Sequence, residues 1–235
     1  MSPAAKRSAS EKVIRPDDPW LSRAIFTLRE AAGYLDVPKS TIHAWARPPT
    51  GEPLITVFPR GGAQATVPFI GFAEAYVLAA FRRAGVPLQR IRTVVDALAQ
   101  NLAVEHALAS KRLYTDGAQV LYDYAERNED ELVELVIARA GRQFSEVIRD
   151  HLKRITYGSD GWASRVLLPS YQRAEVVVDP QVAFGRPLVV HGGARVEDLF
   201  DRFIAGDTVA DIAFDFDVPP EQVEDVIRVA TRTAA

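Results

Sequence analysis

Apolar residues recur at positions i, i+3, i+4 and i+7 within residues 28–35, which predicts a short helix with one buried face. Thr27 and Glu30 have the spacing of a capping box at its start. Residues 36–38 (Asp-Val-Pro) end this helix, and a second helix is predicted from position 38 or 39 to Trp45. Two short helices joined by a tight turn are typical of a helix-turn-helix. The alternative is a pair of packed helices that binds no ligand.

Two β-rich segments, residues 54–58 and 65–70, flank a turn at residues 59–63 that contains two adjacent glycines. This pattern predicts a β-hairpin with Arg60 at its tip. A helix-turn-helix followed by such a hairpin is a winged helix. We therefore expect Arg60 to reach a phosphate or the minor groove of bound DNA.

Two longer helices are predicted next, over residues 72–84 and 87–101. Gly85 suits the end of the first helix. The second helix carries a narrow apolar stripe at heptad-like spacing. Such a stripe fits a dimer seam and fits core packing equally well.

The order of these parts resembles the MerR-type DNA-binding module. The matching stretches are FTLREAAGYLDVPKSTIHAW (residues 26–45) and FRRAGVPLQRIR (residues 81–92). The predicted hairpin departs from the pattern because it lacks the aromatic and basic run that is usual in these regulators. The resemblance implies a DNA-binding domain over residues 26–102.

Candidate DNA contacts lie on or just after the second helix, because the N-terminal residues of a recognition helix enter the major groove. Lys and Arg suit phosphate or guanine, and Ser and Thr hydroxyls donate to phosphate. The alternative is a solvated polar face. The candidates, including the residue at the hairpin tip, are Lys39, Ser40, Thr41, His43, Arg47 and Arg60. Four further arginines either extend this basic surface or serve solubility: Arg82, Arg83, Arg90 and Arg92.

The middle of the chain carries no motif that indicates a chemistry. Residues 113–138 alternate in a strand-like manner, whereas residues 144–155 have helical spacing. Short apolar runs at residues 166–169 and 176–180 predict two strands. We expect a small mixed α/β region over residues 103–170.

After a short strand and glycine turn within residues 184–196, three helices are predicted over residues 197–205, 208–215 and 220–231. The second and third have the spacing of a helix-turn-helix, but their surface is acidic and repels phosphates. This unit is therefore expected to bind protein rather than DNA. Its acidic residues are Asp207, Asp211, Asp215, Asp217, Glu221, Glu224 and Asp225.

The same segment resembles domain-of-unknown-function family 433, a small helical domain of antitoxins. The residues that match its characteristic stretch are Gly185, Arg186, Pro187, Arg195 and Val196. A basic helix-turn-helix ahead of this domain is similar to VapB-type antitoxins, which pair with a PIN-domain ribonuclease toxin. We expect the partner-binding residues to be Arg186, Arg195, Asp211 and Asp215.

Composition narrows the possible functions. The chain has 235 residues, no cysteine and a formal net charge of −3. The absence of cysteine excludes disulfides, thiolate metal sites, iron–sulfur clusters and a cysteine nucleophile. Residues 1–115 carry 15 Lys and Arg against 9 Asp and Glu, whereas residues 116–235 carry 13 against 22. Either this asymmetry arises by chance, or it indicates a basic half that faces a polyanion and an acidic half that faces another partner or the basic half itself.

Sequence motifs of enzymes are missing. The four histidines have no metal-ligand spacing, and the chain has neither a phosphate-binding loop nor a dinucleotide fingerprint. We expect no cofactor, no metal and no catalytic activity. No apolar run approaches the roughly 20 residues of a membrane span, and residues 1–20 do not form a signal peptide, so a cytoplasmic protein is expected.

The sequence therefore predicts a mostly helical α+β protein. Its parts are a disordered arm (1–19), a winged helix-turn-helix (20–102), an α/β middle region (103–170) and a trihelical antitoxin-type domain (171–235). The expected function is that of a homodimeric antitoxin that binds double-stranded DNA, represses its own promoter and neutralises a PIN-domain ribonuclease. The alternatives are a MerR-like one-component regulator that senses a small molecule and an interaction protein that never touches DNA.

Overall fold

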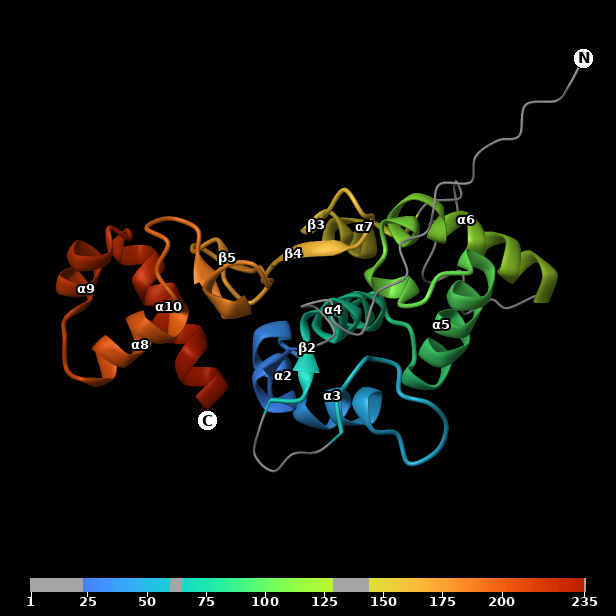
Figure 1. Cartoon of the computed structure of the whole chain (residues 1–235), viewed down its shortest axis with the longest axis horizontal. Helices are drawn as coiled ribbons and strands as arrows, with labels where there is room; N and C mark the ends of the chain where they lie inside the picture. Colours follow the sequence, from blue (N-terminus) through green and yellow to red (C-terminus); the bar gives the residue numbers. More distant parts are fainter. Residues whose placement is uncertain (1–22, 60–64, 129–143, 235) are drawn as a thin grey trace, which may run out of the picture.

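Short breaks containing Pro or Gly separate apolar stripes of helical spacing, so the chain folds mostly into helices (Figure 1). The computed structural model describes residues 23–59, 65–128 and 144–234. The helices are α2 (Leu28–Leu35), α3 (Lys39–Ala46), α4 (Phe69–Arg83), α5 (Leu88–Leu102), α6 (Lys111–Asn128), α7 (Glu146–Leu152), α8 (Val196–Ile204), α9 (Val209–Phe216) and α10 (Pro220–Ala234). The strands are β1 (Ala24–Phe26), β2 (Val67–Pro68), β3 (Ile155–Tyr157), β4 (Ala163–Leu167), β5 (Val176–Val178) and β6 (Leu188–Val189). The mostly helical α+β class is confirmed.

The predicted helix pair near the start of the chain forms as the pattern indicates. The Thr27 hydroxyl accepts a hydrogen bond from the Glu30 N–H (3.1 Å), and the Glu30 carboxylate accepts one from the Thr27 N–H (2.7 Å). The capping box is therefore confirmed. Asp36 ends α2 in the left-handed conformation (φ 55°), and α3 begins directly after Pro38. The two helices pack against each other, and the side chains of Leu35 and Ile42 are fully buried in the core.

The predicted hairpin is wrong over the residues that the structure describes. Residues 54–58 form no strand, and β2 instead pairs antiparallel with β1. One backbone hydrogen bond joins the two segments, from the Phe58 N–H to the Thr66 carbonyl (2.8 Å). Pro68 explains part of the error, because it lacks an N–H for a longer ladder and suits the start of α4. Arg60 and the predicted turn lie outside the described residues, as does the predicted arm, residues 1–19.

Helix α4 is the centre of the molecule, because it is buried on all sides from Phe69 to Phe81. A helix that is apolar all round belongs in a core rather than at a surface. It lies against the non-strand segment before it, since a side chain at Gly71 would stand 2.0 Å from the Thr56 carbonyl oxygen. Helix α5 packs beside it through four residues that line its inner face. These residues, Ile91, Val94, Leu98 and Leu102, place the apolar stripe of α5 in the core of this chain.

The prediction of strands within residues 113–138 is wrong over residues 113–128, and its remainder lies outside the described residues. Residues 111–128 form α6, which packs against α5, and residues 129–143 lie outside the described part. The Asp116-Gly117 pair resembles a turn in sequence, but here the glycine lies inside a helix. A side chain at Gly117 would come within 3.0 Å of the Phe144 ring, so the glycine is needed for close packing.

A four-stranded antiparallel sheet in the order β3-β4-β5-β6 joins the middle of the chain to its C-terminal part. Its strands come from both sides of position 170. Three helices, α8, α9 and α10, follow at almost the predicted positions and pack on one another. Figure 1 shows that the C-terminal end of α10 lies beside α2, and residues of the two helices are in contact.

The otherwise apolar buried part of α4 contains one carboxylate, and both of its oxygens have polar partners. Glu74 is 5% exposed, accepts a hydrogen bond from the Thr56 N–H (2.6 Å) and lies 2.8 Å from Nδ1 of His106. Burial alone lowers the pKa of His106, but the hydrogen bond and charge of Glu74, with the charge of Glu105, outweigh it and leave the pKa raised.

This pair predicts a pH-dependent stability. Because the pKa of His106 is raised in the folded state, its contribution is fully present below about pH 6.5 and is lost as the pH rises through the folded-state pKa. Urea unfolding at several pH values should show this loss in the wild type. The His106→Gln variant should lack that part of the pH dependence; an identical pH profile for the two proteins would contradict the prediction.

Candidate nucleic-acid interface

The outer face of α3 carries most of the predicted DNA contacts. Lys39, Ser40 and His43 are exposed, and Arg47 at the end of the helix is half-exposed. The opposite face holds Ile42, Trp45 and Ala46 in the core. The helical period therefore presents a polar, cationic face to solvent.

Thr41 lies on the inner side of α3. Its side chain is buried, and its hydroxyl accepts a hydrogen bond from the guanidinium of Arg82 in α4. The reason is again the period of the helix, which places position 41 beside Ile42 and Trp45 rather than with Ser40 and His43. Thr41 thus fixes the orientation of α3 against α4.

Arg83, the last residue of α4, contacts the C-terminal end of α2. Its guanidinium donates to the Leu35 carbonyl at the end of α2 (2.8 Å) and lies 2.8 Å from Nε2 of His151 in α7. Nδ1 of His151 lies 3.0 Å from the Val147 carbonyl. Burial, and then the charge of Arg83, outweigh that backbone hydrogen bond and lower the pKa of His151, so the ring is a neutral acceptor. Arg82 and Arg83 therefore fix the positions of α3 and α2 against α4.

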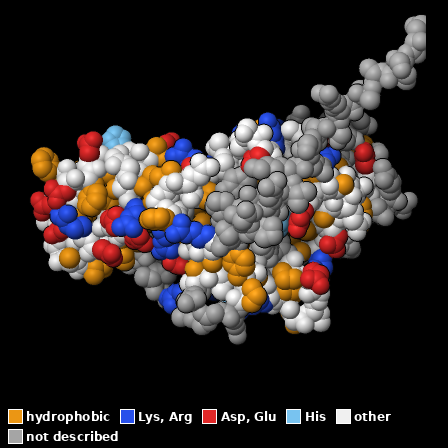
Figure 2. Space-filling model, viewed as in Figure 1, with side chains coloured by type: hydrophobic (Ala, Val, Ile, Leu, Met, Phe, Trp, Pro, Cys, Tyr) orange, Lys and Arg blue, Asp and Glu red, His pale blue; other side chains and the backbone are white. Residues whose placement is uncertain are grey.

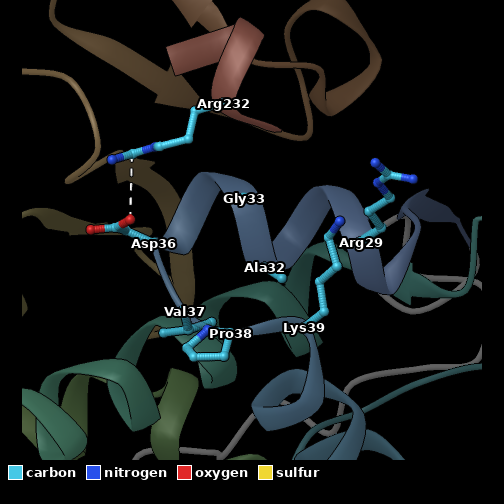
Figure 3. A pocket seen from close by; sticks show the side chains of 8 residues that line it. All are labelled: Arg29, Ala32, Gly33, Asp36, Val37, Pro38, Lys39 and Arg232. Carbon is cyan, nitrogen blue, oxygen red and sulfur yellow. Dashed lines mark ion pairs between the residues drawn. The ribbon is translucent and has the colours of Figure 1, made fainter. Parts of the chain in front are cut away.

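A pocket of about 430 Å³ lies where α2, the turn and α3 meet α10 (Figure 3). We call it the junction pocket. Arg232 of α10 reaches Asp36 in the turn, with 3.3 Å between the guanidinium nitrogen and the carboxylate oxygen. Arg29 and Lys39 lie along the other side. Its lining residues are Arg29, Ala32, Gly33, Asp36, Val37, Pro38, Lys39 and Arg232.

Arg186, predicted to bind a partner, lies at the junction of the two ends of the chain. Its guanidinium donates to Glu30 of α2 (2.9 Å), to Glu197 of α8 (3.2 Å) and to the Ile25 carbonyl of β1 (3.2 Å). A side chain at the preceding Gly185 would stand 2.5 Å from Ile25, and Gly185 has φ 78°. The Gly-Arg pair therefore fits the C-terminal unit against the helix-turn-helix.

The other three residues predicted to bind a partner also have partners within the chain. Arg195 pairs with Asp198 (2.6 Å), and Asp215 pairs with Arg202 (2.7 Å). The carboxylate of Asp211 accepts a hydrogen bond from the hydroxyl of Thr208, the N-cap of α9 (2.6 Å). These side chains remain partly or largely accessible to solvent.

Asp225, by contrast, does not belong to the acidic surface. It is 5% exposed, and its carboxylate accepts hydrogen bonds from three consecutive backbone N–H groups, those of residues 172–174, at 2.7, 2.8 and 3.1 Å. Arg228 pairs with the second carboxylate oxygen at 2.5 Å. This arrangement ties α10 to the loop that follows β4.

Three apolar side chains on α8 and α9 are exposed to solvent, which was not predicted from the sequence. Phe214 is 87% exposed, Ile204 67% and Phe203 38%. Figure 2 shows acidic and hydrophobic side chains gathered at the end of the molecule that contains α8 and α9. The exposure of Phe214 could have been predicted from the helical period, because Phe214 falls outside the inward stripe that Ile212, Ala213 and Phe216 define in α9.

The described residues contain neither a candidate metal site nor a helix that could span a membrane. They contain no group of three or more His, Asp or Glu side chains that could hold a metal ion. Among the helices of that same part, none has both the length and the apolar character required to cross a membrane.

Known proteins match both ends of the chain. A family model described as "Putative DNA-binding HTH domain" matches residues 24–95, and one described as "Protein of unknown function (DUF433)" matches residues 176–230. The chain is 43% identical over 221 residues to "Putative antitoxin VapB45" of Mycobacterium tuberculosis (strain ATCC 25618 / H37Rv), which covers 86% of this chain and 92% of that relative. The X-ray crystal structure of Rv2018 from Mycobacterium tuberculosis has a similar fold, with a TM-score of 0.77, 44% identity, and coverage of 86% of this chain and 96% of that one.

These matches confirm the resemblance to an antitoxin with an N-terminal helix-turn-helix and a C-terminal family 433 domain. Antitoxins are not enzymes, which agrees with the expectation that the chain has no catalytic activity. With 43% identity across most of both chains, this protein belongs to the VapB45 antitoxin family.

Proposed function

We propose that this antitoxin represses its own promoter as a homodimer and neutralises a PIN-domain ribonuclease toxin. The observation that carries the DNA-binding part is the outer face of α3, where Lys39, Ser40, His43 and Arg47 share one solvent-facing side. Within the part of the chain that the structure describes, neither Lys39 nor Arg47 has an ion pair. Cations of this kind are available to phosphates and to guanine.

The geometry behind this face supports the same proposal. A B-DNA major groove, about 12 Å wide, admits one α-helix. Arg82 and Arg83 hold α3 and α2 rigidly on α4, so the helix is presented in a fixed orientation. In a dimer, two such helices would read half-sites about 34–36 Å apart. Arg60, outside the described residues, remains a predicted phosphate contact.

The toxin-binding part of the proposal is supported by the surface of α8 and α9. Exposed aromatic and aliphatic side chains surrounded by charge are typical of protein interfaces, and buried aromatic anchors carry much of their binding energy. Phe214 and Ile204 are such exposed side chains, and Asp211 and Asp215 lie beside Phe214 in sequence. An acidic rim suits a nuclease whose RNA-binding site is basic.

The experiment is coexpression with the neighbouring reading frame, followed by copurification and a ribonuclease assay. We expect a stable complex in which the nuclease is inactive. A neighbour unrelated to nucleases, together with no copurifying partner, would contradict the proposal.

Phe214→Ala should weaken toxin binding by about 30-fold, which corresponds to the loss of about 2 kcal/mol expected for an interface anchor. The fold should be unaffected, because the side chain is 87% exposed. Tyr114→Ala removes another exposed aromatic side chain, on α6, and should leave the affinity unchanged. Isothermal titration of both variants against purified toxin measures the difference; equal affinities would remove Phe214 from the interface.

A further inference from the structure

The junction pocket is lined by more cationic than acidic side chains and is built from both ends of the chain. Three of its lining residues are cations, Arg29, Lys39 and Arg232, against the single carboxylate of Asp36. Arg29 and Lys39 come from the helix-turn-helix, whereas Arg232 comes from the last turn of α10. A pocket with this balance of charge favours an anionic ligand.

The ion pair between Arg232 and Asp36 leaves N–H donors of the guanidinium available for a ligand. The side chains of Arg232 and Asp36 are 51% and 55% exposed, and the pair is made through one guanidinium nitrogen at 3.3 Å. Arginine has five N–H donors in a planar fork that matches the oxygens of a phosphate. Asp36 therefore holds the head group of Arg232 at the pocket while further donors remain available to a ligand.

Lys39 connects the pocket to the outer face of α3. It occupies the first turn of that helix and also lines the pocket (Figure 3). DNA-binding helix-turn-helix proteins place the outer face of the second helix in the major groove, while cationic side chains and helix N-termini beside it contact the phosphate backbone. A duplex seated on the outer face of α3 would therefore bring its backbone next to Lys39.

We propose that the junction pocket receives a backbone phosphate of the operator duplex, and that Arg232 of the C-terminal unit is a direct DNA contact. This inference rests on the proposed role of α3 as the recognition helix. It extends the DNA-binding surface beyond the helix-turn-helix, to the last helix of the chain. Loss of the Arg232 side chain alone should then weaken DNA binding although α3 is unchanged.

Two other roles for Arg232 make different predictions. As a neutraliser of Asp36, it would only cancel the repulsion between that carboxylate and DNA. If Arg232 only holds α10 against the turn between α2 and α3, its effect on DNA binding would also depend entirely on its ion pair with Asp36. In both cases the effect of losing Arg232 should disappear when Asp36 is already uncharged.

The test is a double-mutant cycle on the full-length protein, with fluorescence anisotropy of a duplex from its own promoter over a series of salt concentrations. Arg232→Ala should bind about tenfold more weakly at low salt, and the slope of log affinity against log salt should fall by about one. Asp36→Asn should bind as tightly as wild type or more tightly. The loss caused by Arg232→Ala should persist in the Asp36→Asn background.

Two control variants separate this contact from general effects. Lys153→Ala removes a cation that also pairs with a carboxylate, Asp150 at 3.2 Å. Lys153 lies at the C-terminal end of α7, which Figure 1 shows apart from α3. This variant should leave both affinity and slope unchanged. Arg232→Lys should retain the slope. Circular dichroism and thermal unfolding of each variant establish that the fold is intact, as expected for a half-exposed side chain.

The outcomes are distinct. An unchanged slope for Arg232→Ala, or an effect that vanishes in the Asp36→Asn background, overturns the inference and leaves the role of α3 intact. If the wild-type protein shows no salt-dependent binding to duplex DNA, both the inference and the proposed function are overturned.

Discussion

Asp225→Ala should destabilise the protein by about 3 kcal/mol or more, the largest stability effect that we expect from a single polar substitution. The carboxylate accepts three backbone hydrogen bonds from residues 172–174 and pairs with Arg228. Its loss leaves three backbone N–H donors without their acceptor. The N–H of Ala174 is buried, and the cost of a buried donor without an acceptor exceeds the net value of the bond that it made. Urea unfolding measures the difference.

The pH dependence of Asp225 has a definite sign. Burial raises the pKa of its carboxyl, but the backbone N–H groups and Arg228 together outweigh burial and leave the pKa below its ordinary value. A carboxyl with a lowered folded-state pKa stabilises the protein above its unfolded pKa, about 3.9, and loses that contribution as the pH falls through the folded-state value. Asp225→Asn should therefore lose part of the acid sensitivity of the wild type.

Glu224→Ala provides the matched control, because Glu224 is the neighbouring carboxylate on the same helix and is exposed. Its substitution should change the unfolding free energy by less than about 0.5 kcal/mol. Equal stabilities of the Asp225→Ala and Glu224→Ala variants would show that the contacts of Asp225 do not stabilise the fold.

Replacing both Lys39 and Arg47 by alanine should weaken binding to the promoter duplex at least about 30-fold. Each cation is expected to contribute about 1–3 kcal/mol through phosphate or guanine, and 1.4 kcal/mol corresponds to a tenfold change in affinity. Because Lys39 is exposed and Arg47 lies at the helix end, the thermal stability should hardly change. Electrophoretic mobility shifts with the purified protein measure the loss.

The control for this pair is Lys153→Ala with Arg154→Ala, which removes the same charge from two exposed residues. These residues lie between α7 and β3, and Figure 1 shows both elements apart from α3. That variant should bind DNA as the wild type does. If both double variants retain full affinity, the outer face of α3 is not the DNA-binding surface.

Elements with a complete local signal were predictable from the sequence. The helix α2 has an apolar stripe, a capping box at Thr27 and Glu30, and a break before Pro38, and all three features appear in the structure. The three C-terminal helices have similar stripes and breaks. Local sequence patterns predict an element correctly where the caps, breaks and apolar stripe of that element agree with the tertiary packing.

Errors arose where tertiary contacts decide the local structure. Gly117 has the sequence signature of a turn, yet α6 continues through it because the Phe144 ring occupies the space of the missing side chain. The β-rich segment 54–58 forms no strand, because its backbone lies against Gly71 of α4 and bonds to Glu74 instead of to a longer ladder.

The candidate site was only partly predictable for the same reason. The period of α3 separates exposed Lys39 from buried Thr41, and this could have been read from the sequence. Contacts between distant segments could not. No local pattern links Arg186 to Glu30 or Arg232 to Asp36, because more than 150 positions separate the members of each pair.

The salt dependence of promoter binding by the full-length protein tests most directly whether α3 lies against duplex DNA. Log affinity should fall linearly with log salt concentration, and a surface making 6–10 phosphate contacts should lose about 10³–10⁵ in affinity between 50 and 200 mM salt. An affinity that stays constant over this range would contradict a DNA-binding role for the helix-turn-helix.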